Sequence, residues 1–462
     1  MLEFFLKLFF KKGNKKDKDH DSPSQKASYP YALSVFTFLA LQSFLATGGS
    51  LHLVFPDLPT PIAFTSGRAM HLNLSLLWPL LGIMGSACYF IVEFTGNELY
   101  TPKLIKWNFW YLLITILLLL ASLALGHTEG REYLEAPFPF KVALLVGFLF
   151  FILNLLISIF KNRLLYHPET IIMFSGFLLA SLLYLPNLFP VLHPTVDDTF
   201  RFLVVHLWEE GSLELVATTV ASLWLATLKV VPLNRAKRLI LWEAILVLFS
   251  GALASAHHLY WIGLPRFWQL IGAAASAIQV IPIVLLGITA FRSLYSSNLN
   301  HISLYFFYSS VFWNIVGVGL LGFLLALPPL NFYVHGTYLT SAHSHMALFG
   351  FFGFLVLGTS YFILTRRYSL SAAHKKRVKL SVILLNSGLA IMSGSLILTG
   401  LLQSYLCYVA GLNFTRTHLL LHPYLLLRAA GGAVFGAGAF LLALEMWLHF
   451  FRLVIFQTLQ HR

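Results

Sequence analysis

Apolar runs of about twenty residues recur along the whole chain, and they constrain its fold more than any other feature. Each run is long enough to cross the hydrocarbon core of a bilayer, which is about 30 Å thick. Only 11% of the 462 residues are charged, whereas a soluble domain carries roughly 25%. The runs are continuous and lack the alternation of β-barrel strands. The sequence therefore predicts an all-α integral membrane protein, since helices satisfy their own backbone groups in lipid.

We expect about twelve transmembrane helices in one domain over residues 31–462. The predicted helices cover 31–54, 70–94, 106–126, 141–161, 169–189, 200–228, 236–262, 266–293, 301–328, 337–365, 377–405 and 427–453. A basic, polar segment that includes GNKKDKDHDSPSQK precedes them. Such a composition is typical of disorder, so we expect residues 1–30 to form a disordered cytoplasmic tail.

The net charge of +13 is explained by membrane topology. With an even helix count both termini share one side of the membrane, and most of the 31 Lys and Arg residues then fall on that side. The positive-inside rule places both termini in the cytoplasm. We therefore expect contact with anionic lipid and no nucleic-acid partner.

Six histidines lie at a similar depth on four predicted helices. These are His71, His206, His257, His258, His343 and His345. With a rise of 1.5 Å per residue, all six fall within roughly 10 Å of the outer face. Polar groups in a membrane are expensive and usually functional. The pattern predicts ligands for haem or metal near one membrane face.

The spacing of His343 and His345 separates their roles. Residues two apart on a helix project about 200° from one another. The two side chains therefore do not share a metal ion, but each can reach a haem on its own side of the helix. His71 is then available as a second axial ligand of one haem.

A second group of side chains has the spacing of a single metal site. His257 and His258 differ by about 100°, so both can meet one ion. His206 and Glu210 are four residues apart and share a helix face, which Glu214 continues one turn deeper. Three histidines and a carboxylate predict one metal ion.

Five motifs together carry a resemblance to a known family. They are GRAMHLNLSLLWPLLGIMG around His71, GREYLEAP at 130–137, VVHLWEEGSLEL at 204–215, AHHLYWIG at 256–263 and HGTYLTSAHSHMALFG at 335–350. From about residue 60 onward the chain resembles the catalytic subunit of the haem–copper oxidase superfamily. Within that superfamily it is most similar to the large, cytochrome b subunit of cytochrome c-dependent nitric oxide reductase. The resemblance implies a subunit I-like bundle.

The resemblance implies two haems. His71 and His345 look like the axial pair of a low-spin, electron-transfer haem b. His343 looks like the proximal ligand of the high-spin haem b₃, where substrate reacts. Three arginines are outer-face candidates to pair with haem propionates: Arg68, Arg131 and Arg428.

The resemblance also implies a non-haem iron and a calcium ion. The iron ligands would be His206, His257, His258 and Glu210. Glu214 resembles a second glutamate of that catalytic site, where it relays protons or tunes the iron. Glu132 and Glu135 match the family's calcium site, which bridges haem propionates.

The implied reaction is the reduction of two NO molecules to N₂O and water in a bacterial inner membrane, with the haems near the periplasmic face. Oxygen reductases of this superfamily use a tyrosine and copper, whereas a carboxylate added to three imidazoles suits iron. No CxxCH motif is present, so a membrane-anchored cytochrome c subunit is the expected electron donor. The short segment before the first helix disfavours the quinol-oxidising branch.

Two positions depart from the family pattern and keep alternatives open. Gln279 stands where relatives have a glutamate, and Tyr338 where they commonly have histidine. The main alternative is an oxygen reductase with copper at the non-haem site, using Tyr338. NO dismutation and a haem-free transporter are further alternatives. Glu243 and Glu445 either line a proton path or form structural pairs with other side chains.

Overall fold

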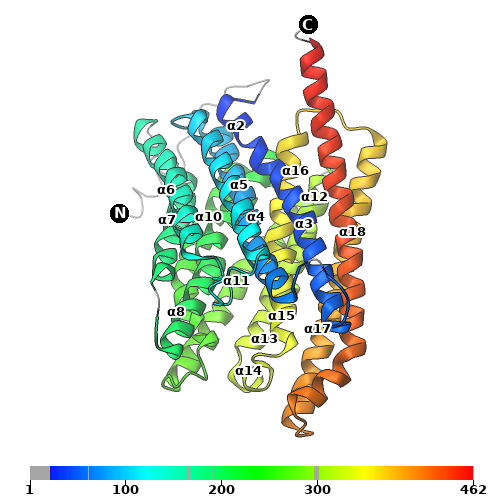
Figure 1. Ribbon diagram of the computed structural model, residues 1–462. Coiled ribbons are helices and arrows are strands. Elements are labelled where there is room, and N and C mark those ends of the chain that lie inside the picture. Colours follow the sequence, from blue (N-terminus) through cyan, green and yellow to red (C-terminus); the bar gives the residue numbers. More distant parts are fainter. Residues whose placement is uncertain are drawn as a thin grey trace.

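The chain forms a bundle of long helices (Figure 1). The computed structural model describes residues 21–460, apart from 61, 163, 165, 166, 190 and 296–300, and these described residues contain no strand. The α-helices are α2 (Pro23–Ala27), α3 (Tyr29–Val54), α4 (Phe64–Thr95), α5 (Pro102–Ala124), α6 (Phe138–Lys161), α7 (Pro168–Tyr184), α8 (Pro194–Leu207), α9 (Glu214–Thr227), α10 (Leu233–Ala254), α11 (Phe267–Tyr295), α12 (Ser303–Trp313), α13 (Gly322–Ala326), α14 (Pro328–Val334), α15 (Tyr338–Ser344), α16 (Phe354–Thr365), α17 (Ala372–Tyr408) and α18 (Phe414–Gln460). Two short 3₁₀ helices are η2 (Leu185–Leu188) and η4 (Ser255–His258), and three π-helical segments are η3 (Trp208–Leu213), η5 (Asn314–Leu321) and η6 (His345–Gly353).

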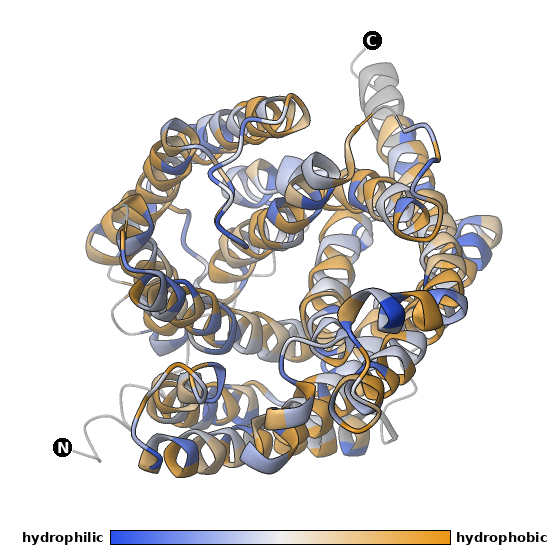
Figure 2. Ribbon diagram, turned by 60° about the horizontal axis from the view of Figure 1, so that its bottom comes forward, coloured by the Kyte–Doolittle hydropathy of each residue, from blue (hydrophilic) through white to orange (hydrophobic). Residues whose placement is uncertain are grey.

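The predicted all-helical membrane fold is confirmed, but the count of twelve spans is not. Ten helices of the described chain are long and apolar enough to cross a membrane. The segment expected at 200–228 forms as α8, η3 and α9, yet it is not among the ten. The helix expected at 266–293 forms as α11, whose apolar part within the described residues is the shorter Phe267–Ile281. Figure 2 shows that hydrophobic residues predominate along the helices.

The described N-terminal residues and the far part of α18 lie at the same end of the bundle (Figure 1). We call this the termini end, and the opposite end, where α14 and the start of α15 lie, the site end. Successive spans reverse direction between the two ends.

The prediction of a disordered tail over 1–30 is wrong for its last ten residues, whereas residues 1–20 lie outside the described part of the chain. Residues 23–27 form α2, and Tyr29 begins α3. A capping box starts α2, because Ser22 and Gln25 exchange side-chain to backbone hydrogen bonds, which satisfies free N–H groups at the helix start.

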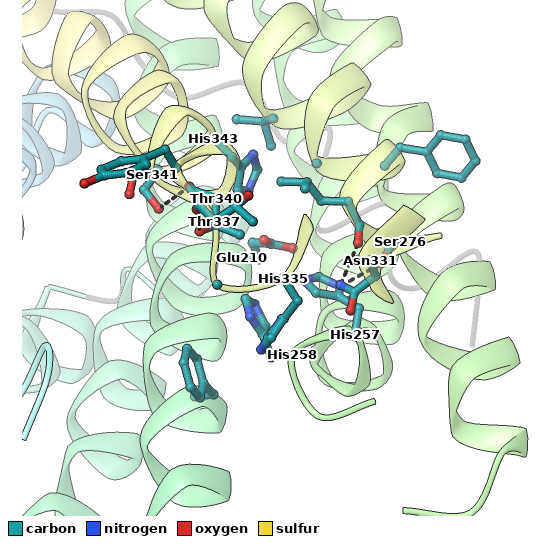
Figure 3. A pocket seen from close by; sticks show the side chains of 18 of the residues that line it. Glu210, His257, His258, Ser276, Asn331, His335, Thr337, Thr340, Ser341 and His343 are labelled. Atoms are coloured by element: carbon teal, nitrogen blue, oxygen red, sulfur yellow. Dashed lines mark hydrogen bonds between the residues drawn. The ribbon is translucent and has the colours of Figure 1, made fainter. Parts of the chain in front are cut away.

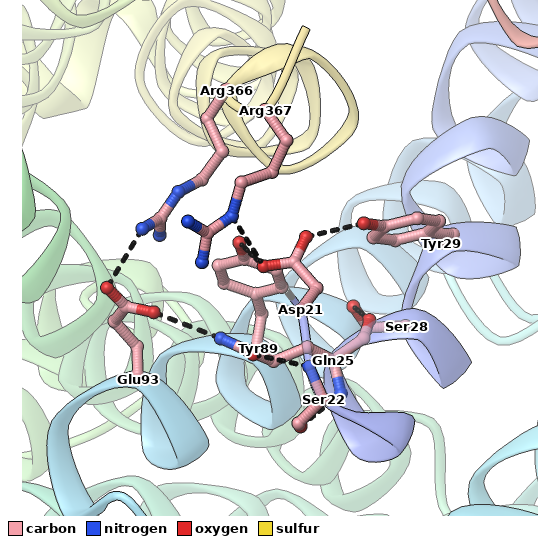
Figure 4. Close-up of polar contacts among 9 residues, drawn as sticks. All are labelled: Asp21, Ser22, Gln25, Ser28, Tyr29, Tyr89, Glu93, Arg366 and Arg367. Carbon is pink, nitrogen blue, oxygen red and sulfur yellow. Dashed lines mark hydrogen bonds and ion pairs between the residues drawn. The ribbon is translucent and has the colours of Figure 1, made fainter. Parts of the chain in front are cut away.

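A buried carboxylate anchors this N-terminal segment to the bundle (Figure 4). Asp21 accepts hydrogen bonds from the hydroxyls of Tyr29 at 2.5 Å and Tyr89 at 2.8 Å. It also pairs with Arg367 at 3.1 Å, beyond the end of α16. Its side chain is 1% exposed. The order of residues 21–30 therefore depends on partners more than sixty residues away, which local composition does not reveal.

Removing the Asp21 charge is expected to destabilise the termini end. Asp21→Asn weakens three bonds to a buried carboxylate, and bonds to charged groups contribute about 1.5–3 kcal/mol each when measured alone. We expect a lower midpoint of thermal unfolding for the detergent-solubilised protein. Asp57→Asn, at an exposed loop position, is the control and should leave the midpoint unchanged. Equal midpoints for both variants would contradict the anchoring role.

The helix α4, which carries His71, packs closely against α16, which follows the π-helical segment η6 that begins at His345. A Cβ atom on Gly82 of α4 would lie 2.2 Å from Val356 of α16, so only glycine permits this approach. From α3, the Gln42 side chain donates to the carbonyl of His71 at 3.1 Å and accepts from Trp78 at 2.6 Å. The backbone carbonyl of His71 is thereby bonded to a side chain of the neighbouring helix α3.

Candidate metal centre

Three histidines from two helical segments converge near the site end. The ligand atoms of His206, His257 and His258 all lie within 4.8 Å of one another. His206 is in the last turn of α8, and the adjacent pair forms the end of the 3₁₀ turn η4. Ring centroids are 5.1 Å apart for His206 and each of the other two, and 4.2 Å apart within the pair. The geometry is that of three ligands around one ion.

Hydrogen bonds fix the tautomers of two of these rings. The Nε2 of His206 donates to the carbonyl of Gly251 at 3.1 Å, because a carbonyl only accepts. The Nδ1 of His206 then accepts a hydrogen bond from the Nε2 of His258 at 3.1 Å. The Nδ1 of His257 lies 3.0 Å from Ser276 Oγ, whose own hydrogen is donated to a backbone carbonyl. Such outer hydrogen bonds orient metal-binding imidazoles and fix their tautomers.

Glu210 lies beside this cluster on the π-helical segment η3. Its Oε2 is 3.6 Å from the Nε2 of His206. Figure 3 shows its carboxylate between His343 on one side and the His257–His258 pair on the other. These four side chains line a cavity of about 480 Å³, a volume typical of small-molecule and cofactor sites. π-helical turns occur frequently at functional sites.

Glu214 occupies a different position from the one expected. It is buried but is not among the residues that line this cavity. The π-helical turns of η3 separate it from Glu210, so the two residues do not follow the regular α-helical spacing on which a shared face depends.

His343 enters the same cavity from α15. Its Nδ1 donates to the carbonyl of Gly317 at 2.9 Å, which leaves Nε2 free. A Cβ atom on Gly322 would lie only 2.9 Å from the ring carbon Cε1. The ring is therefore held between a carbonyl on η5 and the first residue of α13. This fits an imidazole that presents one nitrogen to a haem iron.

Adding a methyl group at Gly322 is expected to displace the His343 ring. We expect Gly322→Ala to reduce bound b-type haem, measured by the pyridine haemochrome spectrum of the purified protein. Gly394→Ala is the matched control, since a Cβ atom there meets nothing within 4 Å. Full haem content in both variants would show that His343 is not constrained in this way.

His71 and His345 face each other across a second cavity of about 400 Å³. Their ring centroids are 6.2 Å apart and their planes differ by 26°. Two bonds of about 2.0 Å from imidazole nitrogens to one central metal place ring centroids roughly 6 Å apart. The Nδ1 of His345 donates to the carbonyl of Ser341 at 2.7 Å, and the buried Nδ1 of His71 has no partner among the described residues. This arrangement fits an axial pair.

The two cavities share a wall, which Tyr338, Ser341 and Ser344 of α15 help to form. His343 borders one cavity and His345 the other, as their 200° separation predicts. Glu132 and Tyr133 from the loop after α5 also border both cavities.

The predicted arginines differ in position. Arg68 and Arg428 line the cavity of His71 and His345, and the buried Nε of Arg428 has no partner within the described chain. Such an orphaned donor fits a propionate. Arg131 lines neither cavity and pairs with Asp197 at 2.6 Å.

The two carboxylates expected to bind calcium have different partners. Glu132 pairs with Arg68. Glu135 turns inward and accepts hydrogen bonds from the Asn73 side chain and the Tyr133 backbone, both at 3.2 Å. Burial raises the pKa of the Glu135 carboxyl. The calcium site stays a prediction of the resemblance.

A family model described as "Cytochrome C and Quinol oxidase polypeptide I" matches residues 26–434 of this chain. The chain belongs to this family. Its haem–copper oxidase relatives imply that it binds haem.

Two curated relatives come from Stutzerimonas stutzeri. The B subunit of nitric oxide reductase is 29% identical over 384 residues, which cover 77% of this chain and 78% of the relative. Cbb3-type cytochrome c oxidase subunit CcoN1 is 22% identical over 441 residues, which cover 86% and 88%. A cryo-EM structure of a heme-copper terminal oxidase dimer matches with a TM-score of 0.77 and 14% identity, over 93% of this chain and 84% of that chain. The structural match shows the fold.

Sequence reasoning missed the groups that orient the imidazoles. These are the carbonyls of Gly251, Gly317 and Ser341 and the hydroxyl of Ser276. It also missed His335, which lines the larger cavity. Backbone carbonyls leave no signal in a sequence, but His335 stands in the same motif as His343 and was visible there.

Proposed function

We propose that this protein is the catalytic subunit of a nitric oxide reductase, which converts two NO, two electrons and two protons to N₂O and water. The observation that carries the proposal is Glu210, whose carboxylate lies beside three histidine ligands and faces the cavity of His343. Three imidazoles and a hard anionic oxygen form a donor set suited to iron. The relative with 29% identity, a nitric oxide reductase chain, supports the same interpretation.

Each residue of the site has a distinct task in this proposal. His71 and His345 hold a low-spin haem b, and His343 holds haem b₃. His206, His257 and His258 hold the non-haem iron, and Glu210 completes its ligands. When bound, the two irons of the larger cavity supply Lewis-acid contacts that bring two NO nitrogens together. Phe202 stacks on the ring of His258 with centroids 5.4 Å apart and planes 12° apart, which helps to orient that ligand.

Electrons enter, in this proposal, from a membrane-anchored cytochrome c subunit, because the chain has no CxxCH motif. The protein spans a bacterial inner membrane, with its termini end in the cytoplasm and both haems near the periplasmic face. Arg68 and Arg428 would pair with the propionates of the low-spin haem. The reaction is then a step of denitrification within a respiratory chain.

An oxygen reductase with copper at the non-haem site is the second candidate. Tyr338 lines the same cavity as His343. In this candidate it would take the place of the active-site tyrosine of the oxygen reductases. The cbb3-type oxidase relative also matches 86% of the chain. NO reduction is favoured because Glu210 places a carboxylate beside the three histidines (Figure 3), a donor set that suits iron.

The substrate that the purified protein consumes, NO or O₂, distinguishes the two candidate functions. Protein purified with its electron donor should consume NO and release N₂O, as measured with an NO electrode and by gas chromatography. Glu210→Gln removes the anionic ligand, and we expect NO turnover to fall by roughly a hundredfold while the spectrum of the low-spin haem persists. Asp198→Asn, nearer the start of α8 and paired with Arg201, is the control and should keep wild-type turnover. Rapid O₂ reduction without NO reduction would establish the second candidate instead.

A further inference from the structure

An uncharged amide borders the cavity of the metal centre. Gln279 of α11 lines the cavity of Glu210 and His343, and it is 7% exposed. Its buried Nε2 makes no hydrogen bond with the described part of the chain. Leaving a buried donor without an acceptor costs about 1–3 kcal/mol, and buried polar groups in native proteins are nearly always bonded. The free amide therefore indicates an acceptor that these residues do not supply.

The face of α11 that carries Gln279 also supports the metal ligands. Ser276 lies three residues earlier, on the same side of the helix, and its hydroxyl bonds to the Nδ1 of His257 at 3.0 Å. Figure 3 shows Ser276 beside His257 at the wall of the cavity. Ser276 and Gln279 both line this cavity. The amide therefore lies about one helical turn from a residue that orients a metal ligand.

A glycine on α10 makes room for this amide. A Cβ atom on Gly251 would lie 3.8 Å from the Nε2 of Gln279 and 2.9 Å from the backbone carbonyl oxygen of Glu210. The carbonyl of the same glycine accepts the hydrogen bond from the Nε2 of His206. Gln279 therefore lies next to the backbone that packs on Glu210 and orients His206.

Other polar side chains of the cavity have already used donor hydrogens. Several of them donate to backbone carbonyls, namely Ser276, Thr337, Thr340, Ser344 and Asn331. A hydroxyl has one hydrogen to give, whereas a side-chain amide has two. Because the Nε2 of Gln279 has no partner within the described residues, both of its hydrogens remain for an acceptor.

A neutral donor suits the electrostatics of this cavity. Two carboxylates line it, Glu132 and Glu210, and Glu132 pairs with Arg68. The Glu210 carboxylate faces the histidines (Figure 3). A further carboxylate at position 279 would add like charge in a poorly solvated space, whereas an amide donates at any pH because it does not titrate. The amide thus supplies positive partial charge, which favours a ligand atom of negative partial charge.

We propose that Gln279 is a substrate-binding residue, whose side-chain amide donates a hydrogen bond to the oxygen of a diatomic molecule bound in this cavity. The identity of the substrate, NO, rests on the proposed function. A diatomic molecule bound to ferrous iron through its nitrogen or carbon gains partial negative charge on its oxygen, which makes that oxygen the acceptor. No proton is transferred in this interaction, since the amide does not titrate.

Carbon monoxide is the probe of this hydrogen bond, because it binds to reduced high-spin haem and is not turned over. A donor at its oxygen lowers the C–O stretching frequency. In infrared spectra of the reduced, CO-bound protein, we expect Gln279→Met to move the C–O band to higher frequency. We also expect it to weaken CO binding by roughly twofold to tenfold.

Gln269→Met is the matched control for this variant. Gln269 lies on the same helix and lines neither cavity, so its replacement should leave the C–O band and the affinity for CO unchanged. An unshifted band in Gln279→Met that still binds its haem would mean that the amide does not meet the ligand, and would overturn the proposal.

The wild-type protein supplies a measurement that does not depend on how a variant folds. Transfer from H₂O to D₂O replaces the amide hydrogens by deuterium, and we expect a small shift of the C–O band. Absence of this shift would overturn the proposal. A deuterium shift that persists in Gln279→Met would assign the donor to another group and would overturn it as well. If Gln279→Met loses its haem, the wild-type measurement decides the question.

NO kinetics separate this proposal from the proposed function. We expect Gln279→Met to raise the KM for NO by roughly twofold to tenfold with kcat near the wild-type value, which is the pattern for loss of uniform substrate binding. A band that shifts as expected in a protein that does not reduce NO would overturn the proposed function and leave the hydrogen bond in place. NO reduction together with an unshifted band would overturn the hydrogen bond and leave the proposed function in place.

Discussion

The structure depends on one constraint: in four of the six candidate ligand imidazoles, one ring nitrogen donates a hydrogen bond to a protein oxygen. His206, His257, His343 and His345 each have one ring nitrogen bonded to a carbonyl or hydroxyl oxygen. The other nitrogen of His206 bonds to the ring of His258, whereas in the other three rings the second nitrogen is available as a metal ligand. A neutral imidazole held in this way is expensive in a membrane unless a metal takes its free lone pair. Both cavities are arranged around such rings.

Glycine and π-helical geometry make this arrangement possible. Gly82 lets α4 approach α16, and Gly322 leaves room for the ring of His343. Glu210 and His345 lie on π-helical segments, where the wider turn alters which side chains share a face. The fold therefore places Glu214 where regular α-helical spacing alone would not.

Much of the fold and of the cluster was predictable because depth and spacing are properties of the sequence. The separation of His343 from His345 follows from helical periodicity, and so does the pairing of His206 with Glu210. The relation of Glu214 to that site was not predictable, since a π-helical turn interrupts the helix. Neither was the order around Asp21, whose partners are distant in the chain.

The partners of the charged loop residues could not be predicted from the sequence either. Arg131 is adjacent to Glu132 in the sequence, yet its side chain pairs with Asp197 of α8. Glu132 pairs instead with Arg68 of α4. Loop residues take partners from whichever helix ends lie nearest, and that depends on how the bundle is assembled.

The most direct test of the account is the metal content of the purified protein. Iron, copper and b-type haem should be measured per polypeptide, by elemental analysis and by the pyridine haemochrome spectrum. The account predicts two haems b, a third iron that is not in haem, and no copper. One copper in place of the third iron would contradict the role of Glu210 and make the protein an oxygen reductase.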